Sequence, residues 1–189
     1  MLKRKFVSAI GCAALLLAGC TTTSNSASSS DASKRHSLDA SVDNAMSKLY
    51  RQVPDSSDLV RQAKGVLVFP SVITAGLVVG ASYGQGTLRQ GGATTAYYSL
   101  AGGSFGWLAG ADSEALYVLF MTQESLDKFK ASKGWTAGID ASITLVTVGA
   151  SGKVDTRTIK QPVVGFALTN GGLLANLSLE GSKISRLDL

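Results

Sequence analysis

The uncharged stretch between Lys64 and Arg89, KGVLVFPSVITAGLVVGASYGQGTLR, decides how this chain folds. A membrane-spanning helix needs about 20 mainly apolar residues, and the stretch is long enough to supply them. Pro70 and the repeated glycines argue against a helix, because both residue types weaken helices. The β-branched runs Val66–Phe69 and Leu77–Val79 are bounded by Gly and Pro, which is typical of buried strands. We therefore predict strands here, with a glycine-zipper membrane helix as the alternative.

The first residues have the pattern of an export signal. A basic start, Met1–Lys5, precedes the apolar run Phe6–Ala18, which is too short to span a bilayer. The run ends in Leu17-Ala18-Gly19-Cys20, which resembles a bacterial lipobox. That resemblance implies cleavage before Cys20 and acylation of Cys20, and the residue Thr21 after it favours the outer membrane. An ordinary secretory signal with a chance cysteine is the alternative.

This processing divides the chain into residues 1–19 as signal peptide, 20–36 as an acylated Ser/Thr-rich tether and 37–189 as one domain. Removing the signal, with Lys3, Arg4 and Lys5, leaves 15 basic residues against 13 acidic ones, a net charge of +2. The basic residues are scattered, so we expect no nucleic-acid partner. With one histidine and no cysteine beyond Cys20, the sequence gives no metal-ligand spacing, and we expect no cofactor.

Three helices are expected within the domain. Apolar residues at helical spacing predict the first over Ser37–Val53, and Pro54 ends it. Its polar face carries both charge signs, which favours packing on the domain over the alternative, a membrane-surface helix. A short helix follows within Asp55–Lys64, and a third is expected over Thr122–Ser132, capped by Thr122.

The rest of the domain is expected to be strands joined by glycine-rich turns. We predict an α+β, β-rich fold, an antiparallel sandwich or barrel with a few helices that are chiefly N-terminal. The expected strands are Val66–Phe69, Leu77–Tyr83, Thr94–Leu100, Ser104–Ala109, Ala115–Met121, Thr136–Val148, Val154–Ile159, Val163–Thr169, Leu173–Glu180 and Lys183–Leu187.

One motif carries a catalytic pattern. Gly102-Gly103-Ser104-Phe105-Gly106 matches the nucleophile elbow G-x-S-x-G, in which a strand-to-helix turn exposes the serine to a histidine. The chain has one histidine, His36, which precedes the serine, and no helix is expected after it. A serine esterase is therefore a remote alternative, a Ser-Lys dyad stays open, and we expect the protein not to be an enzyme.

Several cations are candidates for contact with lipid headgroups. On the third helix, the alternative is that Lys128 and Lys130 stabilise the helix itself. Glu124 precedes Lys128 by four residues, a spacing that favours an ion pair along a helix. The candidates are Lys48, Arg51, Lys64, Lys128, Lys130 and Lys133.

Short motifs follow one another in order from Ser37 to Leu187. They are Ala63-Lys64-Gly65-Val66, Phe69-Pro70, Ala75-Gly76 with Gly80, Tyr83-Gly84 with Gly86, Gly103-Ser104-Phe105-Gly106, Leu126 with Phe129, Gly134-Trp135, Gly138-Ile139-Asp140-Ala141-Ser142, Val163–Phe166 and Gly171-Gly172-Leu173 through Leu179-Glu180-Gly181. This series resembles the SYLF domain family of bacterial lipoproteins and eukaryotic actin- and phosphoinositide-binding proteins. Thr74 and Ala81 stand where the family pattern has Lys and Gly.

The resemblance implies a non-catalytic module that binds lipid or protein. In eukaryotic relatives the amphipathic segment at the start of the domain is linked to phosphoinositide binding, and Ser37–Val53, with Lys48 and Arg51, corresponds to it here. Actin is absent from a bacterial envelope, so that partner is not expected. We expect an envelope lipoprotein, anchored by its acyl chains, whose domain binds phospholipid or another membrane component. The alternative is a structural or interaction lipoprotein with an envelope or host protein partner.

Overall fold

The uncharged stretch forms two long strands. In the computed structural model, β1 (Gly65–Gly76) and β2 (Val79–Gln90) pair antiparallel, with Leu67 opposite Leu88 and Ile73 opposite Tyr83. The prediction of strands is confirmed, and the membrane-helix alternative is wrong for this stretch. Among the described residues, no helix combines the length and apolar character needed to cross a bilayer.

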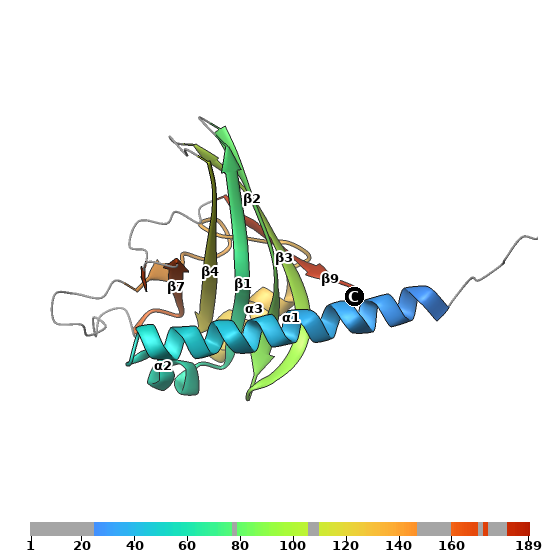
Figure 1. Ribbon diagram of the computed structural model, residues 1–189. Helices are drawn as coiled ribbons and strands as arrows, with labels where there is room; N and C mark the ends of the chain where they lie inside the picture. Colours follow the sequence, from blue (N-terminus) through green and yellow to red (C-terminus); the bar gives the residue numbers. More distant parts are fainter. Residues whose placement is uncertain (1–24, 77–78, 106–109, 147–159, 170–171, 174–180) are drawn as a thin grey trace, which may run out of the picture.

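The structure describes residues 25–76, 79–105, 110–146, 160–169, 172–173 and 181–189 (Figure 1). The predicted signal, Cys20 and the expected strand Val154–Ile159 lie outside these ranges, as does most of the expected strand Leu173–Glu180.

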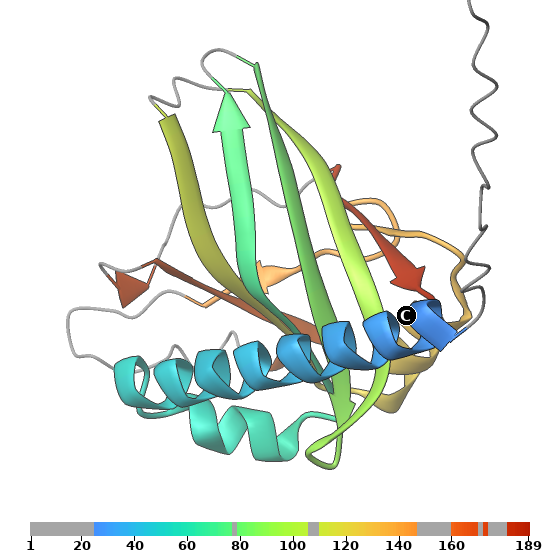
Figure 2. The ribbon, with the colours of Figure 1, turned by 45° about the vertical axis from the view of Figure 1, so that its right-hand side comes forward.

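One curled sheet contains all the described strands, in the order β5-β9-β3-β2-β1-β4-β7-β6, with β8 paired to β7. Figure 2 shows its long strands bending together into a half-barrel. The neighbouring strands are antiparallel except for β6 and β7, which are parallel. The remaining strands are β3 (Ala93–Phe105), β4 (Gly110–Phe120), β5 (Trp135–Thr136), β6 (Thr144–Leu145), β7 (Val163–Thr169), β8 (Gly172–Leu173) and β9 (Lys183–Leu187).

Helices cover both faces of the sheet. The long helix α1 (Asn25–Gln52) and the short helix α2 (Ser56–Gln62) pack on the outer, convex face, where α1 runs across the strands (Figure 1). The third helix, α3 (Gln123–Ala131), packs on the inner, concave face through Leu126 and Phe129. The predicted cap of α3 is confirmed, because the Thr122 hydroxyl accepts a 3.2 Å hydrogen bond from the backbone N–H of Ser125.

The alternation of side chains along the strands separates two hydrophobic cores. The inner core lies between the concave face and α3 and includes Leu67, Phe69, Leu88, Leu116, Val118, Phe120, Leu126, Phe129 and Trp135. The outer core lies between the convex face and the N-terminal helices and includes Val42, Ala45, Leu49, Leu59, Val66, Val68, Tyr117, Leu119, Val164 and Phe166. The first helix is therefore docked on its own domain, as its mixed-charge polar face predicted.

The α+β, β-rich class is confirmed. Of the two expected forms, sandwich and barrel, the curled sheet is closer to a barrel. Three local predictions need correction. The first helix begins at Asn25 rather than Ser37 and so extends into the segment that was expected to stay unordered. The strand expected at Thr94–Leu100 and the first two residues of the one expected at Ser104–Ala109 both belong to β3, and residues 106–109 lie outside the described ranges. The long strand expected over Thr136–Val148 is wrong, because a turn at Gly138, with φ of +85°, separates β5 from β6.

Candidate functional site

A β-bulge at Pro70 sets which side chains reach the outer face of β1. The pairing of β1 shifts by one residue between Val68 and Ser71 against β2, and between Phe69 and Val72 against β4. A central strand tolerates proline at a bulge, where the missing N–H breaks no ladder bond. The extra residue reverses the alternation, so that Val72 joins the inner core while Ile73 lies on the outer face. The distal half of β1 therefore presents an apolar side chain to solvent.

The helix α1 crosses only one part of this outer face, where Val66 and Val68 of β1 are buried (Figures 1 and 2). The part of the sheet beyond the bulge, which includes Ile73, we call distal. Val42, Ala45 and Leu49 are buried against the sheet, and the Tyr117 hydroxyl of β4 donates a 2.7 Å hydrogen bond to the carbonyl oxygen of Ala45. Burial raises the pKa of the Tyr117 phenol, so it remains a donor. This contact fixes the height of α1 on the sheet.

A second set of polar contacts fixes the position of α1 along the sheet. The Asp39 carboxylate accepts hydrogen bonds from the Thr94 hydroxyl at 2.8 Å and the Tyr97 hydroxyl at 3.0 Å. One turn further on, Asp43 pairs with the Arg89 guanidinium at 2.6 Å. These bonds hold α1 on β2 and β3. The outer surface of the sheet on the opposite flank of the helix is not covered by α1.

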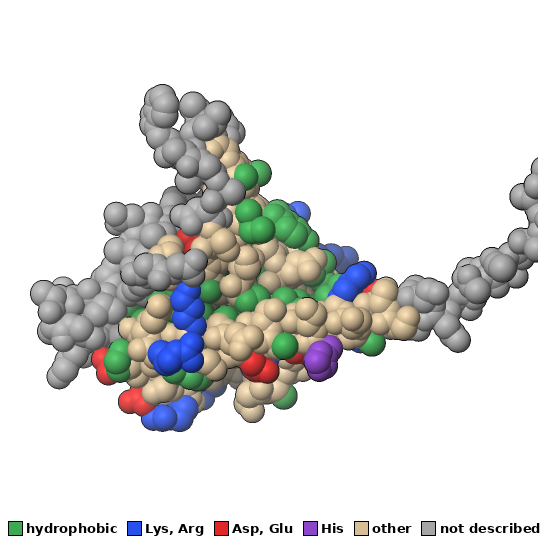
Figure 3. Space-filling model, in the orientation of Figure 1, with side chains coloured by type: hydrophobic (Ala, Val, Ile, Leu, Met, Phe, Trp, Pro, Cys, Tyr) green, Lys and Arg blue, Asp and Glu red, His purple; other side chains and the backbone are tan. Residues whose placement is uncertain are grey.

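A groove of about 690 Å³ follows that side of α1, and we call it the distal groove. Its wall is one flank of the helix, and its floor is the outer surface of β1, β2 and β4. Figure 3 shows hydrophobic side chains gathered on the sheet above the helix, with cations beside them. The lining residues include Ser41, Asn44, Lys48 and Arg51 of α1 and Pro70, Ser71, Ile73, Tyr83, Gln85, Ser113 and Glu114 of the sheet.

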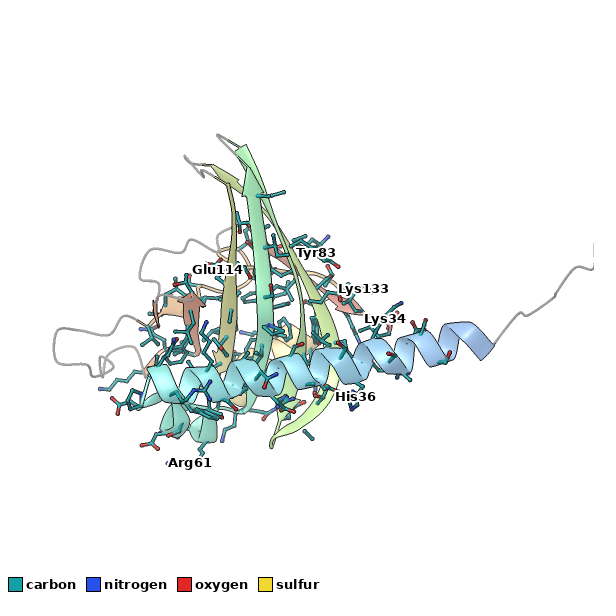
Figure 4. All side chains as sticks on the ribbon, in the orientation of Figure 1. Lys34, His36, Arg61, Tyr83, Glu114 and Lys133 are labelled. Atoms are coloured by element: carbon teal, nitrogen blue, oxygen red, sulfur yellow. The ribbon has the colours of Figure 1, made fainter. Side chains whose placement is uncertain are left out.

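The floor of the distal groove carries an exposed apolar pair. Ile73 and Tyr83 are cross-strand partners, 53% and 52% exposed, respectively. They are two of the four large apolar residues that the described chain exposes; the others are Tyr50 and Ile139. Figure 4 shows Tyr83 on β2 and Glu114 toward β4, both on the part of the sheet above α1. An exposed apolar pair inside a groove favours an apolar ligand.

Two of the predicted cations line this groove. Lys48 and Arg51 are on neighbouring turns of α1, and Lys48 is half-buried while Arg51 is exposed. Within the described part of the chain, the Arg51 guanidinium makes no ion pair, so it is available to a ligand. Glu114 of β4 is the acidic residue of the lining. The groove thus joins positive charge on its wall to apolar surface on its floor.

The other four candidate cations do not reach the distal groove. Lys128 and Lys130 are on α3, on the concave side of the sheet, and Lys128 pairs with Glu124 at 2.7 Å. Lys130 donates to the side-chain oxygen of Gln90 at 3.4 Å. Lys133 follows α3, and Lys64 is exposed just before β1. The six predicted cations therefore do not form one surface.

Other predicted positions add no site within the described ranges. Cys20 lies outside them. Ser104 belongs to β3, where it pairs with Gly80, instead of standing on a strand-to-helix turn. Among the described residues, no group of three His, Cys, Asp or Glu side chains could hold a metal ion. Sequence reasoning missed Ile73, and Pro70 within a strand was the signal for the bulge that exposes it.

A sequence model of the family described as "Ysc84: Las17-binding protein actin regulator" matches residues 101–188. Residues 101–188 belong to this family, the SYLF family. The matched SYLF segment starts within β3 and includes β4, α3 and β5 to β9. Membership implies that the domain binds lipids or proteins. A comparison with curated proteins found no match to this chain.

The SYLF segment supplies only part of the distal groove. Ser113, Glu114 and Leu168 lie within it, whereas Lys48, Arg51 and the Ile73–Tyr83 pair precede it. The resemblance between Ser37 and Leu100 lies outside the matched range. The residues that make the groove amphipathic therefore lie outside the part of the chain that the family model matches.

Proposed function

We propose that this SYLF protein is an envelope lipoprotein that binds an anionic phospholipid in the distal groove. One observation supports this function above the others: Lys48 and Arg51 border the same groove as the exposed pair Ile73 and Tyr83. A phospholipid combines a phosphate with acyl chains, so it matches both halves of that lining. No catalytic step is part of the proposal.

The size and chemistry of the groove fit part of a lipid. Its volume of about 690 Å³ lies within the usual range for small-ligand sites, which is roughly 300–1,000 Å³. The Arg51 guanidinium offers a planar pair of donors that suits phosphate oxygens. Ile73, Tyr83 and Pro70 offer apolar surface for the first part of an acyl chain. Acylation at Cys20, which we expect from the lipobox, places the domain beside the bilayer that supplies the lipid.

Vesicle flotation tests this function. The protein is the mature chain from position 20 with Cys20→Ser, so that no acyl chain contributes to binding. We expect flotation with anionic vesicles at low salt and little with neutral ones, because exposed charges are screened by salt. Lys48→Glu with Arg51→Glu should abolish flotation, and Ile73→Ser with Tyr83→Ser should weaken it.

The chain offers a matched control for charge. Lys128→Glu with Lys130→Glu makes the same change in net charge on the concave side of the sheet, away from the groove. This variant should float as the parent chain does. Equal losses of flotation in the two double variants would show that net charge, and not the groove, decides binding. If the parent chain never floats, the domain does not recognise lipid.

A protein partner is the second candidate function. The description of the matched family names a protein that it binds, Las17, and an actin regulator, which favours a protein-binding role for the domain. In a bacterial envelope, the partner would be an envelope or host protein other than actin. Crosslinking from a photoreactive residue placed at Ile73 should then capture one defined protein, whereas capture of lipid alone would contradict this candidate.

A further inference from the structure

The helix α1 lines a second hollow on its opposite flank. This hollow, which we call the arginine pocket, has a volume of about 540 Å³ and lies between α1, α2 and the turn that joins β2 to β3. Figure 4 shows Arg61 below α1, on the side away from Tyr83 and Glu114. The lining residues are Asp43, Met46, Ser47 and Tyr50 of α1, Val60, Arg61 and Ala63 of the α2 region, and Val66, Arg89, Gly91 and Gly92 of the sheet.

Two guanidinium groups from different elements border the arginine pocket. Arg89 of β2 is held in place, because it pairs with Asp43 at 2.6 Å and only 16% of its side chain is exposed. Its Nε is buried without a hydrogen-bond partner. Arg61 of α2 pairs with Asp58, and both of these side chains are well exposed. Exposed ion pairs contribute about 0–1 kcal/mol, so a ligand can displace Asp58 at little cost.

The Tyr50 hydroxyl adds a donor to the same pocket, and a glycine turn borders its mouth. Burial raises the pKa of the Tyr50 phenol, and the charges of Arg89 and Arg61 lower it by smaller amounts. The Tyr50 hydroxyl therefore remains a neutral donor in a pocket that both arginines line. Gly91 and Gly92 form the turn with φ of +59° and +87°, and nothing lies within 4 Å of where their side chains would be. The turn leaves the mouth of the pocket open.

The floor of the arginine pocket is apolar. Met46 and Val66 are buried members of the outer core, and Val60 and Ala63 pack partly buried against it. Small-ligand sites commonly join an apolar lining to a few convergent polar groups. The apolar floor therefore distinguishes this pocket from an ordinary cluster of solvated surface charges.

We propose that the arginine pocket binds a small amphiphilic oxyanion, a carboxylate or phosphate carried on a short apolar group. The planar donors of Arg61 suit two oxygens of one such anion, and the Tyr50 hydroxyl adds a further donor. Arg89, which donates to Asp43 and to the Asp39 carbonyl oxygen, contributes a fixed positive charge at the pocket wall. The apolar group lies over Met46 and Val60. This inference does not depend on phospholipid binding in the distal groove, because the two sites share no lining residue.

Titration followed by nuclear magnetic resonance tests this site. The mature chain with Cys20→Ser is labelled with ¹⁵N and titrated with octanoate, octyl phosphate, octanol and inorganic phosphate, with the alkyl compounds below their micellar concentrations. The amides of Gly91 and Gly92 should shift and saturate with at least one octyl anion. Octanol and inorganic phosphate should bind at least tenfold more weakly, since each lacks half of the recognised chemistry. The tighter of octanoate and octyl phosphate identifies the anion.

Matched arginine variants keep the test specific. Arg61→Gln should weaken octyl-anion binding about tenfold, through loss of a charge-assisted hydrogen bond. Arg51→Gln makes the same change on the other flank of α1 and should leave this affinity unchanged. Tyr50→Phe, a conservative change, should weaken binding by a smaller factor.

Three outcomes would overturn the inference. They are no saturable shift at Gly91 and Gly92 with either octyl anion at millimolar concentration, equal weakening by Arg51→Gln and Arg61→Gln, and equal affinity for octanol. None of these outcomes bears on vesicle flotation, and a failure of flotation leaves this titration unaffected.

Discussion

The hydroxyl of Tyr117 donates a 2.7 Å hydrogen bond to the carbonyl oxygen of Ala45, and so joins the second half of β4 to the C-terminal third of α1. Tyr117 is fully buried, and Ala45 lies on the helix face that packs on the sheet. Both flanks of α1 line a hollow, the distal groove on one side and the arginine pocket on the other. The bond therefore positions both candidate sites at once.

Replacing Tyr117 by Phe should lower the free energy of unfolding by about 1–2 kcal/mol, because the buried carbonyl oxygen loses a donor while the ring still fills its space. Urea denaturation followed by circular dichroism measures the change. Tyr83→Phe is the control, since Tyr83 is 52% exposed, and it should change stability by less than about 0.5 kcal/mol. Equal effects of the two variants would contradict a special role for the buried bond.

Stability should fall at alkaline pH, and Tyr117 should cause part of the fall. Burial raises the pKa of Tyr117 above the ordinary tyrosine value of 10.0. The unfolded chain therefore releases this proton near pH 10 while the folded chain keeps it, so the contribution is intact below pH 10 and is lost as the pH rises further. Denaturation at several values between about pH 9 and pH 11 should give a shallower decline for Tyr117→Phe. Buried Tyr98, whose pKa burial also raises, should maintain part of the slope.

Replacing Asp39 by Ala should loosen the docking of α1 on β2 and β3. The variant removes the acceptor for the Thr94 and Tyr97 hydroxyls, and two lost hydrogen bonds cost about 1–3 kcal/mol. Hydrogen exchange should quicken at the backbone amides of α1, while those of α3 stay protected. Asp31→Ala is the control, because among the described residues the Asp31 carboxylate contacts Lys34 and Ser30 of the same helix rather than the sheet, and the change should leave exchange unchanged.

Replacing Gly86 by Ala should destabilise the fold by about 1–3 kcal/mol through overpacking. A side-chain carbon on Gly86 would stand 2.2 Å from the carbonyl oxygen of Val68, which is too close for the two strands to keep their spacing. Gly103→Ala on β3 is the matched control, since nothing lies within 4 Å of its added carbon. Thermal unfolding of the two variants should differ clearly, and similar melting temperatures would show that β1 and β2 can separate locally.

Much of the fold could be predicted where local pattern and tertiary environment agree. Val163–Thr169 and Lys183–Leu187 were predicted with the bounds that β7 and β9 have, because apolar runs between turn residues decide both. The helix α3 was predicted from its cap and its two buried residues. The start of α1 was not, since residues before Ser37 have no apolar stripe. Extending a helix that is already docked costs far less than starting one.

The candidate site was only half predictable for a related reason. Lys48 and Arg51 could be chosen because the resemblance aligns Ser37–Val53 with the lipid-linked amphipathic segment of eukaryotic relatives. Simple alternation from Val66 and Val68 would have placed Val72 outward and Ile73 inward, and the bulge at Pro70 reverses that order. Which face a residue occupies after a bulge depends on both neighbouring strands, and a sequence read along one strand does not contain that information.

The early start of α1 changes how the acyl anchor proposed at Cys20 would hold the domain away from a membrane. At 1.5 Å per residue, the turns from Asn25 to Ser37 reach about 20 Å as a rod, and they continue directly into the docked part of the helix. A flexible linker would allow the domain to reorient freely, whereas a continuous helix couples the orientation of its first turns to that of the sheet. The two hollows beside α1 therefore keep a fixed orientation relative to the start of the helix, and under the proposed anchoring at Cys20 they would approach the membrane over a narrower range of angles than on a flexible tether.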